Sequence, residues 1–162
     1  MWFRNLRRRR IPGMLEGVLG KEVVDKLLYG PFEEPEPQNR TLDFLLVLIR
    51  DSDTRKTAAL IKQALQVMSQ HECMIDTVSG SYIRCLYGGL VPEENGEERR
   101  AELVCRLKER FTDEIKIVHG RRESLFGNFG CDSRAAFTAI IPGYCDAIRE
   151  LGNLEFGQVK EI

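Results

Sequence analysis

The chain has 162 residues, of which 43% are hydrophobic and 30% are charged, so it is long enough for one globular domain with short extensions but not for two full domains. The formal net charge is -1, which gives no overall electrostatic basis for binding nucleic acid. No stretch reaches the roughly 20 apolar residues of a membrane-spanning helix, and the N-terminus lacks the apolar core of a signal peptide. We therefore expect a soluble cytoplasmic domain whose partners bind through local features.

The cysteines point to free thiols. They are widely spaced and form no C-x-x-C pair: Cys73, Cys85, Cys105, Cys131 and Cys145. Only two histidines accompany them, so the chain lacks the ligand spacing of a zinc site. The odd number also argues against a disulfide framework, and we expect buried free thiols in a reducing compartment.

The first 40 residues are predicted to precede the main domain. Residues 1–13 form a basic tail, which holds five arginines and two aromatic residues in its first ten positions. We expect this tail to be solvated, with weak contact with a membrane surface as the alternative. Residues 14–40 combine an amphipathic helical pattern, which ends near Gly30-Pro31, with a linker rich in proline and glutamate. The domain itself is predicted to cover residues 41–162.

Hydrophobic periodicity predicts alternating strands and helices in this domain. Nearly continuous apolar runs predict buried strands, whereas apolar residues three and four positions apart predict amphipathic helices. The predicted elements, in chain order, are a strand over 42–49, a helix from 53 or 54 to about 70, a hairpin of strands 73–78 and 82–87, a helix over 97–111, a strand over 115–118 that resumes after 120 toward 126, a short apolar segment from 137, and a helix that opens at 142. The first six elements have the order of a ferredoxin-like βαββαβ sandwich, which is an α+β fold.

Separated pieces of the chain resemble the class III adenylate and guanylate cyclase catalytic domain, and they occur in that family's order. Residues 22–30 look like the helix before the first strand, and Val47-Leu-Ile-Arg-Asp51 is similar to that strand with its metal-binding aspartate. Residues 75–88 are similar to the central hairpin, and Gly127-Asn-Phe-Gly130 is similar to the family's Gly-Asn-Ile-Gly turn. The resemblance covers roughly residues 20–151 and implies a fold of the nucleotide cyclase type.

The resemblance also implies a two-metal reaction, in which the ribose 3'-oxygen of a nucleoside triphosphate attacks the α-phosphorus and pyrophosphate leaves. Two carboxylates hold the divalent cations in such an enzyme, because Mg²⁺ and Mn²⁺ prefer oxygen ligands. Here Asp51 occupies the first metal-ligand register, whereas Ser81 replaces the second aspartate at the hairpin tip. Asp51 is expected to cap the following helix, with metal binding as the alternative. If the domain is active, Mg or Mn is its expected cofactor.

Four further registers read the base and stabilise the transition state in the family. A lysine on the hairpin and an acidic residue before the last helix read the purine, and an asparagine and an arginine on that helix stabilise the transition state. In these registers the chain has Thr77, Pro142, Cys145 and Arg149. Only the arginine is retained. Arg149 is either a vestigial transition-state residue or one member of a surface ion pair.

Four of the six registers are therefore replaced, which favours a degenerate, non-catalytic cyclase homology domain. Such a domain would act in intracellular signalling by dimerisation, regulation or nucleotide sensing, and a homodimer is expected. The alternative is an active adenylate or guanylate cyclase with atypical site residues, or one half of a heterodimer with another cyclase chain. A third interpretation is a ferredoxin-like binding domain whose similarity is structural only.

Overall fold

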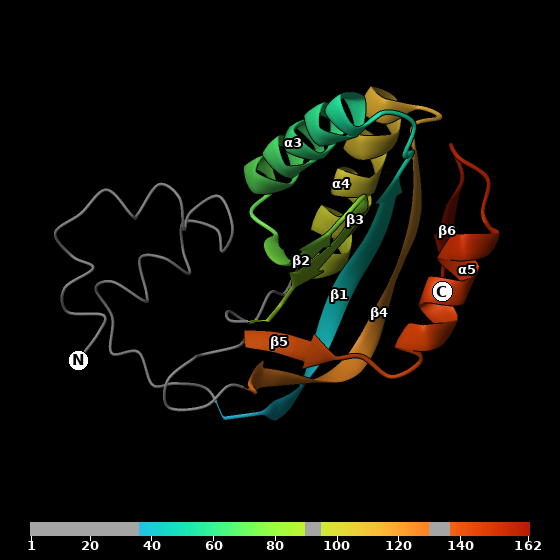
Figure 1. The fold of residues 1–162 in the computed structure, drawn as a ribbon. Helices are drawn as coiled ribbons and strands as arrows, with labels where there is room; N and C mark the ends of the chain where they lie inside the picture. Colours follow the sequence, from blue (N-terminus) through green and yellow to red (C-terminus); the bar gives the residue numbers. More distant parts are fainter. Residues whose placement is uncertain (1–35, 90–94, 130–136) are drawn as a thin grey trace, which may run out of the picture.

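The structure, a computed structural model, describes residues 36–89, 95–129 and 137–162. Figure 1 shows a sheet that is covered by helices on both faces. The basic tail, the predicted helix over 14–29 and Cys131 lie outside the described residues. In the described part of the chain, no helix is long and apolar enough to cross a membrane.

The described residues form six strands and three helices, which alternate as the periodicity predicts. In chain order they are β1 (Gln38–Ile49), α3 (Thr54–Gln70), β2 (Met74–Ser79), β3 (Tyr82–Tyr87), α4 (Gly96–Phe111), β4 (Ile115–Asn128), β5 (Phe137–Ile140), α5 (Tyr144–Asn153) and β6 (Val159–Glu161). The predicted βαββαβ order and the α+β fold are confirmed. The strands are hydrogen-bonded in the order β2-β3-β1-β4-β5, and β6 pairs in parallel with β4.

The two central strands are longer than their apolar runs predict. β1 begins at Gln38 rather than at Leu42, because residues 38–40 pair with the far end of β4. This pairing takes part of the predicted linker into the sheet. β4 runs without a break across Gly120, which lies opposite Phe44 in the ladder. Polar residues can form these strand ends because the antiparallel partner strand hydrogen-bonds with their backbone N–H and C=O groups, and these bonds do not depend on the side chain.

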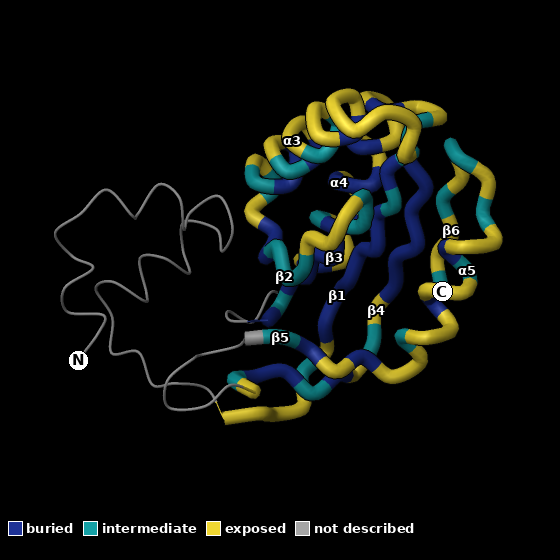
Figure 2. Tube along the Cα trace, in the orientation of Figure 1, coloured by how far each residue is buried: buried dark blue, intermediate teal, exposed yellow. Residues whose placement is uncertain are grey.

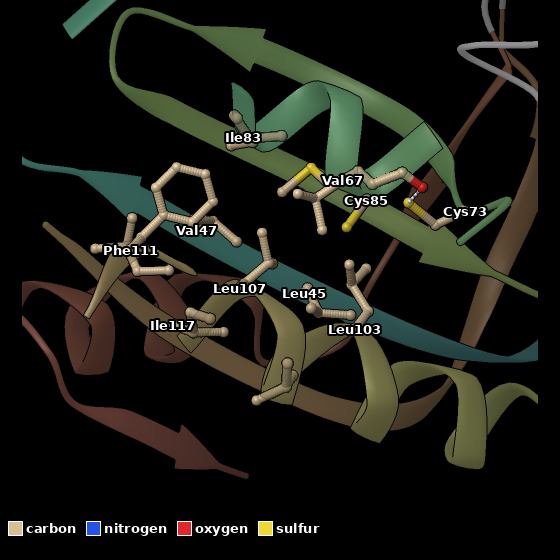
Figure 3. Close-up of a cluster of buried hydrophobic side chains, with 14 of the residues drawn as sticks. Leu45, Val47, Val67, Cys73, Ile83, Cys85, Leu103, Leu107, Phe111 and Ile117 are labelled. Carbon is tan, nitrogen blue, oxygen red and sulfur yellow. Dashed lines mark hydrogen bonds between the residues drawn. The ribbon is translucent and has the colours of Figure 1, made fainter. Parts of the chain in front are cut away.

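Alternate side chains of β1 enter two separate cores. Leu45 and Val47 point toward α3 and α4 and pack with Leu103 and Leu107 (Figure 3). The opposite core gathers side chains from the even positions of β1 and from β5 and α5, with the turn between them: Leu42, Phe44, Leu46, Ala139, Ile141, Ala147 and Leu151. Figure 2 shows that β1 is buried along most of its length. A strand covered on both faces has the continuous apolar sequence seen here.

Four of the five cysteines lie among the described residues, and all four are free thiols. Cys73 and Cys85 are buried beside α3, and Cys73 donates to the carbonyl oxygen of Met68 at 3.3 Å (Figure 3). Cys105 and Cys145 are exposed. The expected burial of the thiols therefore holds for two of the four described positions.

Candidate functional site

The two predicted metal-ligand registers lie at the same end of the sheet. The backbone N–H of Ile49, the last residue of β1, donates to the carbonyl oxygen of Ser81 at 2.9 Å. Gly80 turns the chain at the hairpin tip with a φ of 58°, a backbone angle that favours glycine. Asp51 follows the end of β1 directly after Arg50. The pairing of β1 with β3 thus brings together two positions that are distant in sequence.

The side chains at this end do not fit a pair of divalent cations. Asp51 is exposed, and its Oδ1 accepts a hydrogen bond from Thr57 Oγ1 at 3.2 Å. Ser81 contributes a neutral hydroxyl, and the carboxylate of Asp53 is engaged with helix α3. Within residues 36–89, 95–129 and 137–162, no group of three His, Cys, Asp or Glu side chains is arranged to hold a metal ion. Of the two predicted metal-ligand positions only Asp51 carries a carboxylate, and one carboxylate does not supply the charge that two cations require.

Asp53, not Asp51, caps helix α3. Oδ1 of Asp53 accepts hydrogen bonds from the backbone N–H groups of Arg55 and Lys56 at 2.7 and 3.2 Å, and its backbone is extended, as an N-cap requires. The prediction that Asp51 caps the helix is therefore wrong. Asp51 lies too far before Thr54, the first helical residue, to take that role, and it bonds a side chain one turn into the helix instead.

Two positively charged side chains share one carboxylate beside this end of the sheet. Lys56 Nζ lies 2.7 Å from Glu114 Oε1, and Arg50 Nε lies 3.8 Å from Glu114 Oε2. Arg50 also donates through Nη2 to the carbonyl oxygen of Asp113 at 2.8 Å. Glu114 is thus occupied by two cationic side chains, although solvent screens these partly exposed groups.

A buried ion pair lies next to Thr77, the predicted base-reading position on the hairpin. Thr77 Oγ1 donates to Asp76 Oδ2 at 2.8 Å, and Arg84 donates to the same oxygen through Nε at 2.5 Å and also through Nη2. The Asp76 side chain has no exposed surface. A register shift between Ile75 and Thr77 leaves Asp76 without a paired residue on β3. The Thr77 hydroxyl is thus committed to a carboxylate that an internal cation already neutralises.

The other three predicted site residues lie exposed on and just before helix α5. Pro142 is in the turn that opens the helix, and Cys145 is in its first turn. Arg149 Nη1 donates to Asp146 Oδ1 at 2.9 Å, and each of these two side chains is 70% exposed. The structure therefore shows Arg149 in a surface ion pair, which is the kind of pair that contributes little to stability.

Sequence reasoning missed two tyrosines that connect the hairpin to α5. The hydroxyl oxygens of Tyr82 and Tyr144 lie 2.6 Å apart, and Cζ of Arg84 lies 5.0 Å from the ring centre of Tyr144. Arg84 also donates to Thr138 Oγ1 at 2.8 Å. Alternation along β3 places Tyr82 and Arg84 on one sheet face, which is a signal present in the sequence. Their partners come from β5 and α5, which no local pattern relates to the hairpin.

Comparison with known proteins identifies the fold. No family model matches the sequence, and no curated protein is significantly similar to it. Solved structures do match. The adenylyl cyclase CyaB from P. aeruginosa superposes with a TM-score of 0.68 at 14% sequence identity, over 78% of this chain and 79% of CyaB. This chain has the fold of a nucleotide cyclase catalytic domain.

Two further structures support the cyclase fold. The guanylate cyclase domain of RhGC from Catenaria anguillulae, solved with GTP, matches with a TM-score of 0.64 at 10% identity, over 78% of this chain and 80% of that domain. A non-canonical dimeric guanylyl cyclase domain of the RhoGC fusion protein from Blastocladiella emersonii matches with a TM-score of 0.64 at 11% identity. The match covers 78% of this chain and 81% of that domain. The superpositions establish the cyclase fold, but sequence identities this low do not transfer an activity to this chain.

Proposed function

We propose that this chain is a non-catalytic cyclase homology domain, which acts in cytoplasmic signalling by assembling with a second copy of itself. The observation that carries the proposal is the sheet end at which the Ser81 carbonyl oxygen accepts from Ile49, two residues before Asp51. A two-metal cyclase reaction needs two carboxylates there, and the two predicted metal-ligand positions supply one carboxylate, Asp51, and one hydroxyl, Ser81.

The residues that would read the base and stabilise the transition state are also incomplete. Pro142 has no side-chain donor or acceptor for a purine, and Cys145 offers a weakly hydrogen-bonding thiol where the family has an amide. Arg149 is retained, but it pairs with Asp146 in open solvent. A guanidinium in water has a weak electrostatic effect compared with one held in a site that excludes water. Neither half of the cyclase machinery is therefore complete in this chain.

Exposed apolar side chains support assembly as the role of the domain. Val78 on the hairpin, Ile140 on β5 and Ile148 on α5 expose 47%, 57% and 38% of their surfaces. Large apolar groups in water favour contact with another protein surface, and closed two-fold dimers are the commonest soluble assemblies. A guanylyl cyclase domain with the same fold has been solved as a non-canonical dimer and as a monomer, so the fold is compatible with a homodimer. The exposed free thiols of Cys105 and Cys145 suit a reducing compartment such as the cytoplasm.

An active adenylate or guanylate cyclase is the second candidate, and it is favoured by the exposure of Asp51 and Arg149. Both side chains are accessible to a substrate or to another protein chain. In a heterodimer, a second cyclase chain would have to supply the missing metal-binding carboxylate together with the base-reading residues and the asparagine. This chain lacks parts of the metal-binding set and parts of the set that reads the base and stabilises the transition state. One partner chain would therefore have to complete both sets.

Incubation of the purified full chain with ATP or GTP and Mn²⁺ or Mg²⁺ tests both candidates. We expect no cyclic nucleotide above the level of a protein-free control, as measured by mass spectrometry. Cyclic product that disappears in Asp51→Ala would overturn the proposal and establish the second candidate. Sedimentation equilibrium tests the assembly, and a monomer at high protein concentration would contradict the proposed homodimer.

A further inference from the structure

The side chains that join the hairpin to helix α5 begin beside Thr77 and end at Tyr144, close in sequence to Pro142, and the resemblance assigns purine reading to Thr77 and Pro142. We propose that Asp76, Tyr82, Arg84, Thr138 and Tyr144 form an internal polar lock that closes this place to nucleotides. The polar lock rests on the proposed function and deepens it, because a non-catalytic domain closed to nucleotides is a protein-binding module and not a nucleotide sensor.

A continuous series of contacts crosses between the two base-reading registers. Thr77 donates to Asp76 Oδ2, and the same carboxylate oxygen accepts from Arg84. The guanidinium of Arg84 lies over the ring of Tyr144, the first residue of α5. Pro142, the second register, is in the turn immediately before that residue. Side chains of the chain itself therefore span the space from Thr77 to Tyr144, two residues after Pro142.

The two charged groups of the polar lock neutralise each other. The Asp76 side chain has no exposed surface, and the Arg84 side chain is 11% exposed. Oδ1 of Asp76 is buried and has no hydrogen-bond partner among the described residues, so this carboxylate depends on Arg84 for its stabilisation. Arg84 is further fixed by its bond to Thr138 at 2.8 Å. A purine that entered would have to separate this pair and leave a buried carboxylate without its cation.

The tyrosine hydroxyls close the polar lock on the side of the hairpin tip. Tyr82 is the first residue of β3 and Tyr144 begins α5, and their hydroxyl oxygens lie 2.6 Å apart. Burial, and then the hydrogen bond to Tyr144, raise the pKa of Tyr82 above its usual value. Tyr82 therefore stays neutral at physiological pH, so the bond persists there.

Alkylation of two exposed cysteines reports whether a nucleotide enters. Cys145 directly follows Tyr144, whereas Cys105 lies on α4, which packs on the opposite face of the sheet. The full chain is labelled with iodoacetamide without and with millimolar ATP or GTP, in the absence and presence of Mg²⁺, and both sites are followed by mass spectrometry. We expect the ratio of the two labelling rates to stay unchanged. A several-fold slowing at Cys145 alone would overturn the polar lock.

Hydrogen exchange distinguishes the polar lock from a local packing role. Tyr82→Phe and Tyr144→Phe each remove one hydroxyl of the same bond with little change in volume, so one variant suffices if the other fails to fold. We expect either change to speed amide exchange both in the hairpin and in the first turn of α5. Tyr87→Phe is the matched control, because its hydroxyl donates to the carbonyl oxygen of His71, at the end of α3. Exchange that increases only in the substituted element would refute the polar lock.

The combined outcomes separate the polar lock from the proposed function. Protection of Cys145 by a nucleotide, without cyclic product, would refute the polar lock and leave a non-catalytic nucleotide sensor. Formation of cyclic product would refute the proposed function and the polar lock with it. An unchanged labelling ratio with no product, and coupled exchange in both tyrosine variants, would support both.

Discussion

Arg100 on helix α4 donates through Nη1 to Oδ1 of Asp43 on β1 at 2.8 Å, and these side chains expose only 3% and 4% of their surfaces. Nη2 of Arg100 also reaches Oε1 of Glu161 on β6 at 2.5 Å. Burial raises the pKa of Asp43, and the neighbouring Arg100 cation lowers it only in part. One guanidinium therefore joins a helix, the central strand and the C-terminal strand, and it offsets part of the cost of burying a carboxylate.

Removal of this cation is expected to be strongly destabilising. Arg100→Met should lower the free energy of unfolding by about 3–5 kcal/mol, because it leaves a buried carboxylate without its partner. Urea denaturation measures the change. Asp43→Leu introduced into the same variant should recover a large part of the loss, since no buried charge then remains. A double variant that is as unstable as the sum of two independent losses would show that the charges are not coupled.

The stability of the domain should fall below neutral pH because of His119. Burial, and then Arg100, lower the pKa of His119 below its usual value of 6.5, and Glu161 opposes this only in part. The unfolded chain therefore binds more protons than the folded chain as the pH falls through 6.5, so stability decreases from there down to the folded pKa. His119→Gln should remove this component. Urea denaturation of the unchanged chain and of His119→Gln at several pH values below 6.5 tests this prediction. Stability profiles that fall in parallel would contradict it.

The two aspartates before α3 should differ in their effect on stability. Asp53→Ala should cost about 1 kcal/mol, because it removes the acceptor for two backbone N–H groups at the helix start. Asp51→Ala is the matched control and should cost less, since among the described residues the exposed Asp51 side chain accepts one hydrogen bond, from the Thr57 hydroxyl at 3.2 Å. Thermal unfolding with Mn²⁺ absent compares the variants. A larger loss in Asp51→Ala would contradict the assignment of the cap.

A second carboxylate at the hairpin tip should create a cation site. Ser81→Asp places a carboxylate beside the end of β1, where Asp51 follows, and we expect it to raise Mn²⁺ affinity by about tenfold or more over the unchanged chain. Titration of free Mn²⁺ by electron paramagnetic resonance measures the affinity. Ser79→Asp is the control, because it adds the same charge to an exposed position on the same hairpin. Equal gains in the two variants would mean that net charge, not geometry, attracts the metal.

Two glycines should respond to alanine in opposite directions. Gly127 lies in strand β4 and not in the predicted turn. A Cβ at Gly127 would lie 2.5 Å from Cα and 2.7 Å from N of Pro37, so backbone atoms would have to move. Gly127→Ala should therefore cost about 1–3 kcal/mol. At Gly152 in α5 a Cβ meets nothing within 4 Å, and Gly152→Ala should stabilise by about 0.5–1 kcal/mol. Chemical denaturation checks both signs, and a stabilised Gly127→Ala would show that the contact with Pro37 is not tight.

The fold was predictable because its main elements leave periodic patterns. A strand covered on both faces, such as β1 with Leu45 and Leu46 in opposite cores, has to be continuously apolar, and a helix on one face has to be amphipathic. The polar start of β1 was not predictable, because Gln38 belongs to the sheet only through its pairing with Phe126 of β4. Pairing between distant segments leaves no trace in local hydrophobicity.

The sequence by itself determined which residue types occupy the positions that the resemblance assigns to the cyclase site. Ser81 lacks the negative charge of a carboxylate metal ligand, and the side chain of Pro142 lacks a hydrogen-bonding group that could read a purine. Both statements hold whatever surrounds these residues. Only the tertiary structure decided which partners the remaining groups take: Arg149 pairs with Asp146, and the Arg84 guanidinium lies over the ring of Tyr144. The physical reason is that identity is a property of single residues, whereas burial and hydrogen bonding depend on segments that meet only when the chain folds.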